Sequence, residues 1–175
     1  MQNDEGKIVI TKLSLENTRI YIDKIFKLYN CENNLEFLND KEIFMFISHF
    51  STIQIIPKAN KLDQIINALN TIGLNPYSIG EPIILISKDG NVKPLLPFSR
   101  YLIKLCKNKI YLADKLAEII TYGKLLTLKE VIKEGAYLIM DKNHNFIAYG
   151  TIKREKNKTK IIPELDIGWY LRKGG

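Results

Sequence analysis

The chain has 175 residues, of which 46% are hydrophobic and 26% are charged, so it is long enough for one large or two small domains and its composition excludes a disordered protein. Its apolar runs are far shorter than the roughly 20 residues that a membrane span needs, which predicts a soluble, cytoplasmic protein that does not span a membrane. The net charge of +7 is uneven: residues 1–98 hold 10 Lys and Arg against 11 Asp and Glu, whereas residues 99–175 hold 16 against 8. This imbalance predicts that the second part attracts a polyanion, and RNA, DNA and an anionic membrane surface are the candidates.

The first half of the sequence predicts a domain of mixed helices and strands. Apolar residues recur at three- and four-residue steps over 15–29, which is typical of an amphipathic helix, whereas β-branched and aromatic residues alternate over 42–56. Gly73 is placed to end a second helix, and Asp89-Gly90 is typical of a hairpin turn. The predicted elements are a helix over 14–29, strands over 42–50 and 52–56, a helix over 59–73, and strands over 82–87 and 92–96.

A proline-bounded stretch separates the neutral part of the chain from the basic part. The residues Lys93-Pro94-Leu95-Leu96-Pro97 resist helix formation, because proline lacks the amide hydrogen that a helix interior needs. We therefore predict two domains, an N-terminal α/β domain with an antiparallel sheet over 1–95 and a C-terminal domain over 96–175.

Short strands predominate in the predicted C-terminal domain. Asp114 is placed to cap a helix that Gly123 ends, and the segment from Thr127 to Glu130 has the spacing of a capping box. The predicted elements are strands over 101–106 and 109–112, helices over 114–123 and 127–135, and strands over 136–140, 146–153, 160–162 and 168–172. A small β-barrel with two short helices accommodates them, which makes the whole chain an α+β protein.

The densest group of charges lies between two of these strands. The segment Lys153-Arg154-Glu155-Lys156-Asn157-Lys158-Thr159-Lys160 carries five positive charges and one negative charge. It is either a solvated loop that protects a sheet edge or a site that contacts nucleic-acid phosphates, and the regional excess of positive charge favours the second interpretation. The C-terminal basic residues extend the patch if the last strand returns beside this loop. The predicted RNA-binding residues are Lys153, Arg154, Lys156, Lys158, Lys160, Arg172 and Lys173.

Aromatic residues and cysteines in this sequence are expected to be structural. Tyr149, Trp169 and Tyr170 could stack on bases, but each is better explained as part of a barrel core. Cys31 and Cys106 have no CxxC partner, and we expect two reduced, buried thiols.

Residue patterns that support catalysis are absent from the sequence. His49 and His144 are far apart and lack partners at ligand spacing, and no phosphate-binding glycine loop, nucleophile elbow or Cys/His metal set occurs. We therefore predict a monomeric protein that is not an enzyme and that needs neither a cofactor nor a metal.

Four short segments resemble a known family. Residues 137–141 and 146–150 resemble the strand pair of PUA domains, in which a hydrophobic strand and a turn lead to a strand carrying the Ala148-Tyr149-Gly150 pattern. Residues 166–172 (DIGWYLR) resemble the closing strand of one branch of PUA proteins, and residues 75–80 (NPYSIG) are similar to its RPYSLG passage. This branch is the Nip-seven family of ribosome-biogenesis factors of archaea and eukaryotes, which joins an α/β domain to a C-terminal PUA domain.

The resemblance implies noncatalytic binding of rRNA or pre-rRNA through a basic face of the PUA domain during large-subunit maturation. It also implies that the N-terminal domain can dock ribosome-maturation proteins, and the isoleucine and lysine content suits an archaeal source. Residues 161–165 depart from the family, because they lack the positive charge that relatives carry there. The alternative is an RNA-modifying enzyme or its RNA-targeting subunit, because PUA domains are often attached to such enzymes.

Overall fold

The computed structural model of the chain describes residues 8–74, 76, 78–169 and 172. The chain divides into two compact units: unit 1 is Met1–Lys24 with Asn34–Phe98, and unit 2 is Ile25–Asn33 with Ser99–Gly175. The division thus falls close to the predicted linker, and unit 2 also contains a segment from the first part of the sequence. No helix among the described residues is long and apolar enough to cross a membrane.

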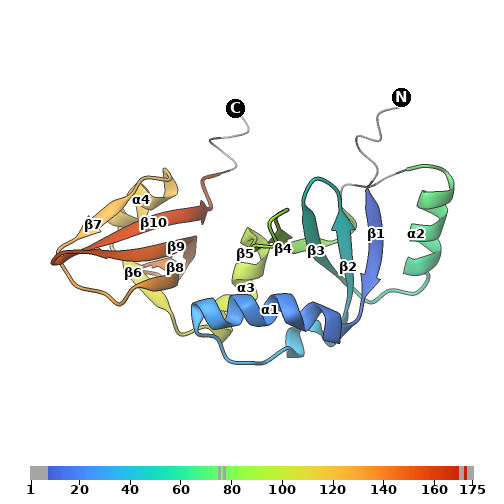
Figure 1. Cartoon of the computed structure of the whole chain (residues 1–175), viewed down its shortest axis with the longest axis horizontal. Coiled ribbons are helices and arrows are strands. Elements are labelled where there is room, and N and C mark those ends of the chain that lie inside the picture. Colours follow the sequence, from blue (N-terminus) through green and yellow to red (C-terminus); the bar gives the residue numbers. More distant parts are fainter. Residues whose placement is uncertain (1–7, 75, 77, 170–171, 173–175) are drawn as a thin grey trace. The chain divides into compact units, whose positions relative to one another are not determined.

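Unit 1 is an antiparallel sheet with helices (Figure 1). Its strands are β1 (Val9–Leu13), β2 (Lys41–Ile47), β3 (Ser51–Pro57), β4 (Glu81–Ile86) and β5 (Val92–Pro94), and they lie in the sheet in chain order. Its helices are α2 (Leu62–Thr71), the first part of α1 (Leu15–Tyr29) and two 3-10 turns, Glu36–Leu38 and Leu96–Phe98. Phe44 and Phe46 of β2 pack against Leu62 and Ile66 of α2, because alternate residues of a strand share one face.

The elements predicted for this part are confirmed, with boundaries that differ by a few residues. Gly73 follows α2 with a φ of +73°, and the amide of Leu74 donates to the carbonyl oxygen of Leu69 at 3.0 Å, so the helix ends with a left-handed glycine as predicted. The Asp89-Gly90 turn joins β4 to β5, with Gly90 at a φ of +78°.

Unit 2 is a five-stranded sheet in the order β6-β8-β9-β10-β7. The strands are β6 (Lys109–Leu112), β7 (Leu126–Leu128), β8 (Gly135–Asp141), β9 (Phe146–Glu155) and β10 (Lys158–Asp166), and the helices are α3 (Ser99–Leu105), α4 (Asp114–Thr121) and the end of α1. β6 pairs with β8 in parallel, and the other pairs are antiparallel. α4 packs on one face of the sheet, where Ile120 lies in a hydrophobic core with Ile139, Ile152 and Ile161. None of these four side chains is more than 1% exposed.

Four details predicted for this part are wrong. The predicted strand over 101–106 is absent, because residues 99–105 form α3. The predicted helix over 127–135 is also absent, because Thr127 pairs with Lys160 in the β7–β10 ladder. Asp114 is the first residue of α4 and Ala113 is its N-cap. Trp169 and Arg172 are helical rather than extended, while 170, 171 and 173 lie outside the described residues.

The prediction of two reduced cysteines is also wrong. Cys31 and Cys106 form a disulfide across 75 positions of sequence. The segments around them pair as an isolated antiparallel bridge, in which Glu32 N–H donates to the carbonyl oxygen of Leu105 at 2.9 Å. The disulfide therefore fastens the segment that follows α1 to the end of α3 within unit 2. The sequence predicted an α+β protein in which an α/β part with an antiparallel sheet precedes a small β-barrel with two short helices. The α+β class is confirmed, and the second part is built on a five-stranded sheet.

Candidate nucleic-acid interface

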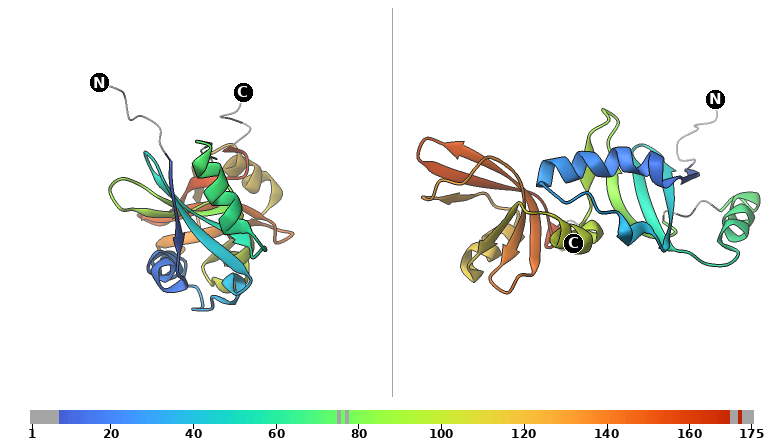
Figure 2. Two further views of the ribbon diagram at one scale, coloured as in Figure 1. Left: turned by 90° about the vertical axis from the view of Figure 1, so that its right-hand side faces the viewer. Right: turned by 90° about the horizontal axis from the view of Figure 1, so that it is seen from below.

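The basic segment forms the end of the β9–β10 hairpin rather than a long loop. The chain turns at Lys156, whose φ is +53°, and the strands pair up to Glu155 opposite Lys158. β8 pairs with β9 only as far as Ile152, so the last three residues of β9 extend past the neighbouring strand. Figures 1 and 2 show this hairpin end, coloured orange to red, at the extremity of its sheet. A protruding hairpin gives phosphate groups access to its side chains.

The strand register places three of the predicted residues on one face. Lys153 lies opposite Lys160, and Lys158 lies opposite Glu155, so the four side chains share a face because directly paired residues project to the same side. Arg154 lies opposite the buried Thr159 and projects to the other face, beyond the core. The structure therefore brings Lys153, Lys158 and Lys160 together, and it does not bring Arg154 to the same surface.

Two lysines that face each other across an antiparallel pair destabilise the sheet. The repulsion between Lys153 and Lys160 is only partly relieved by Glu155, one of whose carboxylate oxygens lies 2.5 Å from the Nζ of Lys160. Within the described part of the chain, Lys153 and Lys158 have no ion-pair partner, and both are exposed. Lys153, Lys158 and Lys160 thus form a hairpin face with uncompensated positive charge, and a bound anion would stabilise it.

Two further lysines lie beside this hairpin, and the sequence analysis missed them. The buried hydroxyl of Thr159 donates to the carbonyl oxygen of Glu130 at 2.6 Å and accepts from the amide of Ile132 at 2.9 Å. These bonds hold the segment after β7 along the hairpin, with Lys129 and Lys133 exposed on it. The wrong helix assignment for 127–135 concealed this neighbourhood, and no local pattern could have shown the pairing of β7 with β10.

Arg172 lies far from the hairpin end. Its guanidinium bonds to the carboxylate of Asp166, the last residue of β10, and to the carbonyl oxygen of Thr121 at the end of α4. Asp166 lies eight positions along the strand from Lys158, a distance of up to about 26 Å at 3.3 Å per residue. Asp166 holds the pKa of Arg172 above its usual range, chiefly through the side-chain hydrogen bond. Lys173 lies outside the described residues.

The aromatic residues divide between core and surface. Tyr149 is 1% exposed and packs edge-on against Tyr29, and burial raises its pKa well above the ordinary value, so its prediction as a core residue is confirmed. Trp169 is 39% exposed, so the prediction that it fills the barrel interior is wrong. Tyr170 lies outside the described residues.

No group of three or more His, Cys, Asp or Glu side chains that could hold a metal ion occurs among the residues that the structure describes. His49 lies in the exposed turn between β2 and β3, and His144 lies in the turn between β8 and β9. The two histidines belong to different units of the chain.

Comparison with known proteins identifies the fold of unit 2. Residues 108–175 match the family model described as the UPF0113 PUA domain. Among solved structures, the chain is similar to a conserved PUA domain protein from Thermoplasma acidophilum, with 13% identity over 89% of this chain and 93% of that chain and a TM-score of 0.52. A search of curated proteins gave no significant match. The strands and helix over 108–175, including the basic β9–β10 hairpin, therefore constitute a PUA domain.

Proposed function

We propose that the chain is a noncatalytic RNA-binding protein whose PUA domain holds RNA on the hairpin face formed by Lys153, Lys158 and Lys160. The observation that carries this proposal is the Lys153–Lys160 pair, in which two like charges face each other at the end of a protruding hairpin. Release of counterions from RNA phosphates would supply the affinity.

The binding site is tested by charge reversal. The variant K153E/K158E changes two exposed lysines of the hairpin face, neither of which has an ion-pair partner among the described residues. If wild-type protein neutralises about four phosphates of single-stranded RNA, the log-log slope of affinity against salt is about −3, and the variant's slope should be shallower by about 1.4. Fluorescence anisotropy with a 15-nucleotide RNA across a salt series measures both slopes.

The matched control is K115E/K124E, which changes net charge by the same amount at the two ends of α4. Both positions are exposed and lie away from the hairpin end. We expect a clearly smaller loss of affinity and an unchanged slope. Equal losses in the two variants would show that the RNA senses only overall charge, and this would overturn the assignment of the hairpin face.

We further propose that the RNA is rRNA or pre-rRNA, that the protein acts in the cytoplasm during maturation of the large ribosomal subunit, and that unit 1 docks a ribosome-maturation protein. The Nip-seven resemblance supports this proposal and also an archaeal source. Crosslinking in the source cell, followed by sequencing of the bound RNA, is the test. Enrichment of large-subunit rRNA supports the role, whereas recovery of tRNA alone with turnover of a modified base would favour the RNA-modifying alternative.

A further inference from the structure

Two aromatic rings meet on the surface of unit 2 at the opposite end of β9 from the basic hairpin. The ring centroids of Tyr111 on β6 and His144 in the β8–β9 turn lie 4.7 Å apart, with the ring planes inclined by 55°. β6 pairs in parallel with β8, so Leu112 lies beside Asp141 and the turn that follows passes next to Tyr111. Tyr111 is 50% exposed and His144 is exposed, so both rings remain accessible to solvent.

The turn holds the histidine in a fixed and unusual conformation. The carboxylate oxygen Oδ1 of Asp141 accepts hydrogen bonds from the amides of Asn143 and Asn145, each at 2.8 Å, and Oδ2 accepts from the side-chain amide of Asn145 at 2.8 Å. His144 has a φ of +65°, a region that glycine or asparagine adopts at lower cost. A ring is therefore displayed at a position where the backbone favours a smaller residue.

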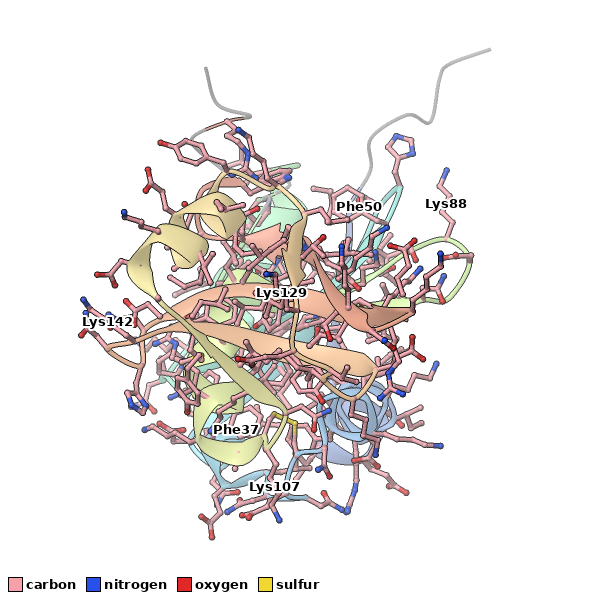
Figure 3. All side chains as sticks on the ribbon, turned by 90° about the vertical axis from the view of Figure 1, so that its left-hand side faces the viewer. Phe37, Phe50, Lys88, Lys107, Lys129 and Lys142 are labelled. Carbon is pink, nitrogen blue, oxygen red and sulfur yellow. A yellow bond between two sulfur atoms is a disulfide. The ribbon has the colours of Figure 1, made fainter. Side chains whose placement is uncertain are left out.

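Positive side chains flank the two rings. Lys109 lies two residues before Tyr111 and therefore on the same face of β6, and it has no ion-pair partner among the residues described. Lys142 precedes His144 in the turn and binds Asp114 at 2.5 Å. Figure 3 shows Lys142 at the margin of its unit, well separated in this view from Lys129, which adjoins the basic hairpin.

We propose that Tyr111 and His144 form a stacking site for an unpaired base of the RNA strand whose phosphates occupy the hairpin face. Exposed aromatic rings bind bases of single-stranded RNA through their π faces, and neighbouring lysines hold the adjoining phosphates. This inference rests on the proposed function. Asn145 and Lys156 lie eleven positions apart, which spans up to about 35 Å of strand and corresponds to about ten stacked nucleotides at 3.4 Å each.

The test measures binding of a 15-nucleotide single-stranded RNA to Y111A, to Y111F and to wild-type protein. Y111A should weaken binding about tenfold, the usual cost of losing a stacked base, and leave the salt slope unchanged because no phosphate contact is lost. Y111F keeps the ring and should bind like the wild type. F50A removes an aromatic ring that is 54% exposed in unit 1, and it should have no effect.

A second measurement uses the unaltered protein. RNA containing 4-thiouridine is crosslinked by ultraviolet light, and mass spectrometry should find adducts on the peptides that carry Tyr111 or His144. If Y111A binds normally and no adduct forms there while K153E/K158E binds weakly, the stacking site is refuted and the hairpin assignment stands. If K153E/K158E also binds normally, the proposed function itself fails.

Discussion

The guanidinium group of Arg172 forms two hydrogen bonds with the carboxylate of Asp166, at 2.9 Å and 2.7 Å, in the bidentate geometry that arginine and carboxylates favour. Asp166 is 3% exposed and also accepts the amide of Gly168 at 2.9 Å. Arg172 also donates to the carbonyl oxygen of Thr121, so the Arg172–Asp166 pair links the end of β10 to the end of α4. The arrangement gives Arg172 a structural task, whether or not it also touches RNA.

Replacement of Arg172 by alanine should lower the free energy of unfolding, because it leaves the buried carboxylate of Asp166 without its charged partner. Urea denaturation measures the change. RNA affinity of the folded variant should stay within twofold of the wild type if the role is structural. A weakened affinity with unaltered stability would instead support the predicted RNA contact.

Gly168 lies against the same junction, and we expect Gly168→Ala to be destabilising. A Cβ atom added there would clash with the carbonyl oxygen of Thr121, so the backbone must shift. The cost should be about 1–3 kcal/mol, as for other overpacked sites. Thermal unfolding monitored by circular dichroism tests this expectation, and an unchanged midpoint would show that the chain accommodates the methyl group.

Thr159→Val removes a buried hydroxyl that serves two backbone groups while preserving the shape of the side chain. The free energy of unfolding should fall by about 2 kcal/mol, because the amide of Ile132 and the carbonyl of Glu130 lose their partner. Thr127→Val is the matched control, since Thr127 is exposed on the neighbouring strand β7 and valine suits a strand. Equal stabilities of the two variants would contradict the anchoring role of Thr159.

Reduction of the Cys31–Cys106 disulfide should destabilise unit 2. On the loop-entropy model, a crosslink that closes about 75 residues contributes about 4 kcal/mol. Denaturation with and without dithiothreitol measures this contribution, and the variant C31S/C106S should not respond to the reductant. Two titratable thiols in the purified, unreduced protein would refute the disulfide.

The Asp141 carboxylate should titrate below its ordinary range. Its pKa is lowered chiefly by the side-chain hydrogen bond from Asn145, with backbone bonds from Asn145 and Asn143 adding to the effect. Because the folded pKa lies below the unfolded one, the stabilisation is complete above about pH 4 and is lost as the pH falls through the folded pKa. NMR titration of the carboxyl carbon, with the urea-unfolded chain as reference, tests the direction.

Sequence patterns predicted most of the strands and three of the four α-helices given for the described residues, because the apolar residues of these elements recur with a clear helical or strand periodicity. They failed where a short apolar run fits the periodicity of a helix and that of a strand equally well. Phe98, Leu102 and Cys106 recur every four residues and are all buried, as in a helix, and residues 99–105 do form one. The same run was predicted to be a strand. They also failed where distant pairing prevails, since the capping-box pattern that begins at Thr127 yields to the β7–β10 ladder.

The basic segment of the candidate site was visible in the sequence, but its division between two faces was not. Side-chain direction depends on register, and the register of β9 and β10 places Arg154 opposite Thr159, away from Lys153. The aromatic pair of Tyr111 and His144 was invisible for a similar reason, because only the parallel pairing of β6 with β8 brings the two rings together.

Unit 2 combines an early and a late segment of the sequence, so it can fold completely only after the late segment has been synthesised. Residues Ile25–Asn33 belong to this unit, including Cys31 and the Tyr29 ring that packs on Tyr149. A ribosome that adds 5–20 residues per second makes Cys31 about 4–15 s before Cys106. The early segment must therefore wait for its partners, and a fragment that starts at Ser99 would carry an odd thiol and an uncovered aromatic surface.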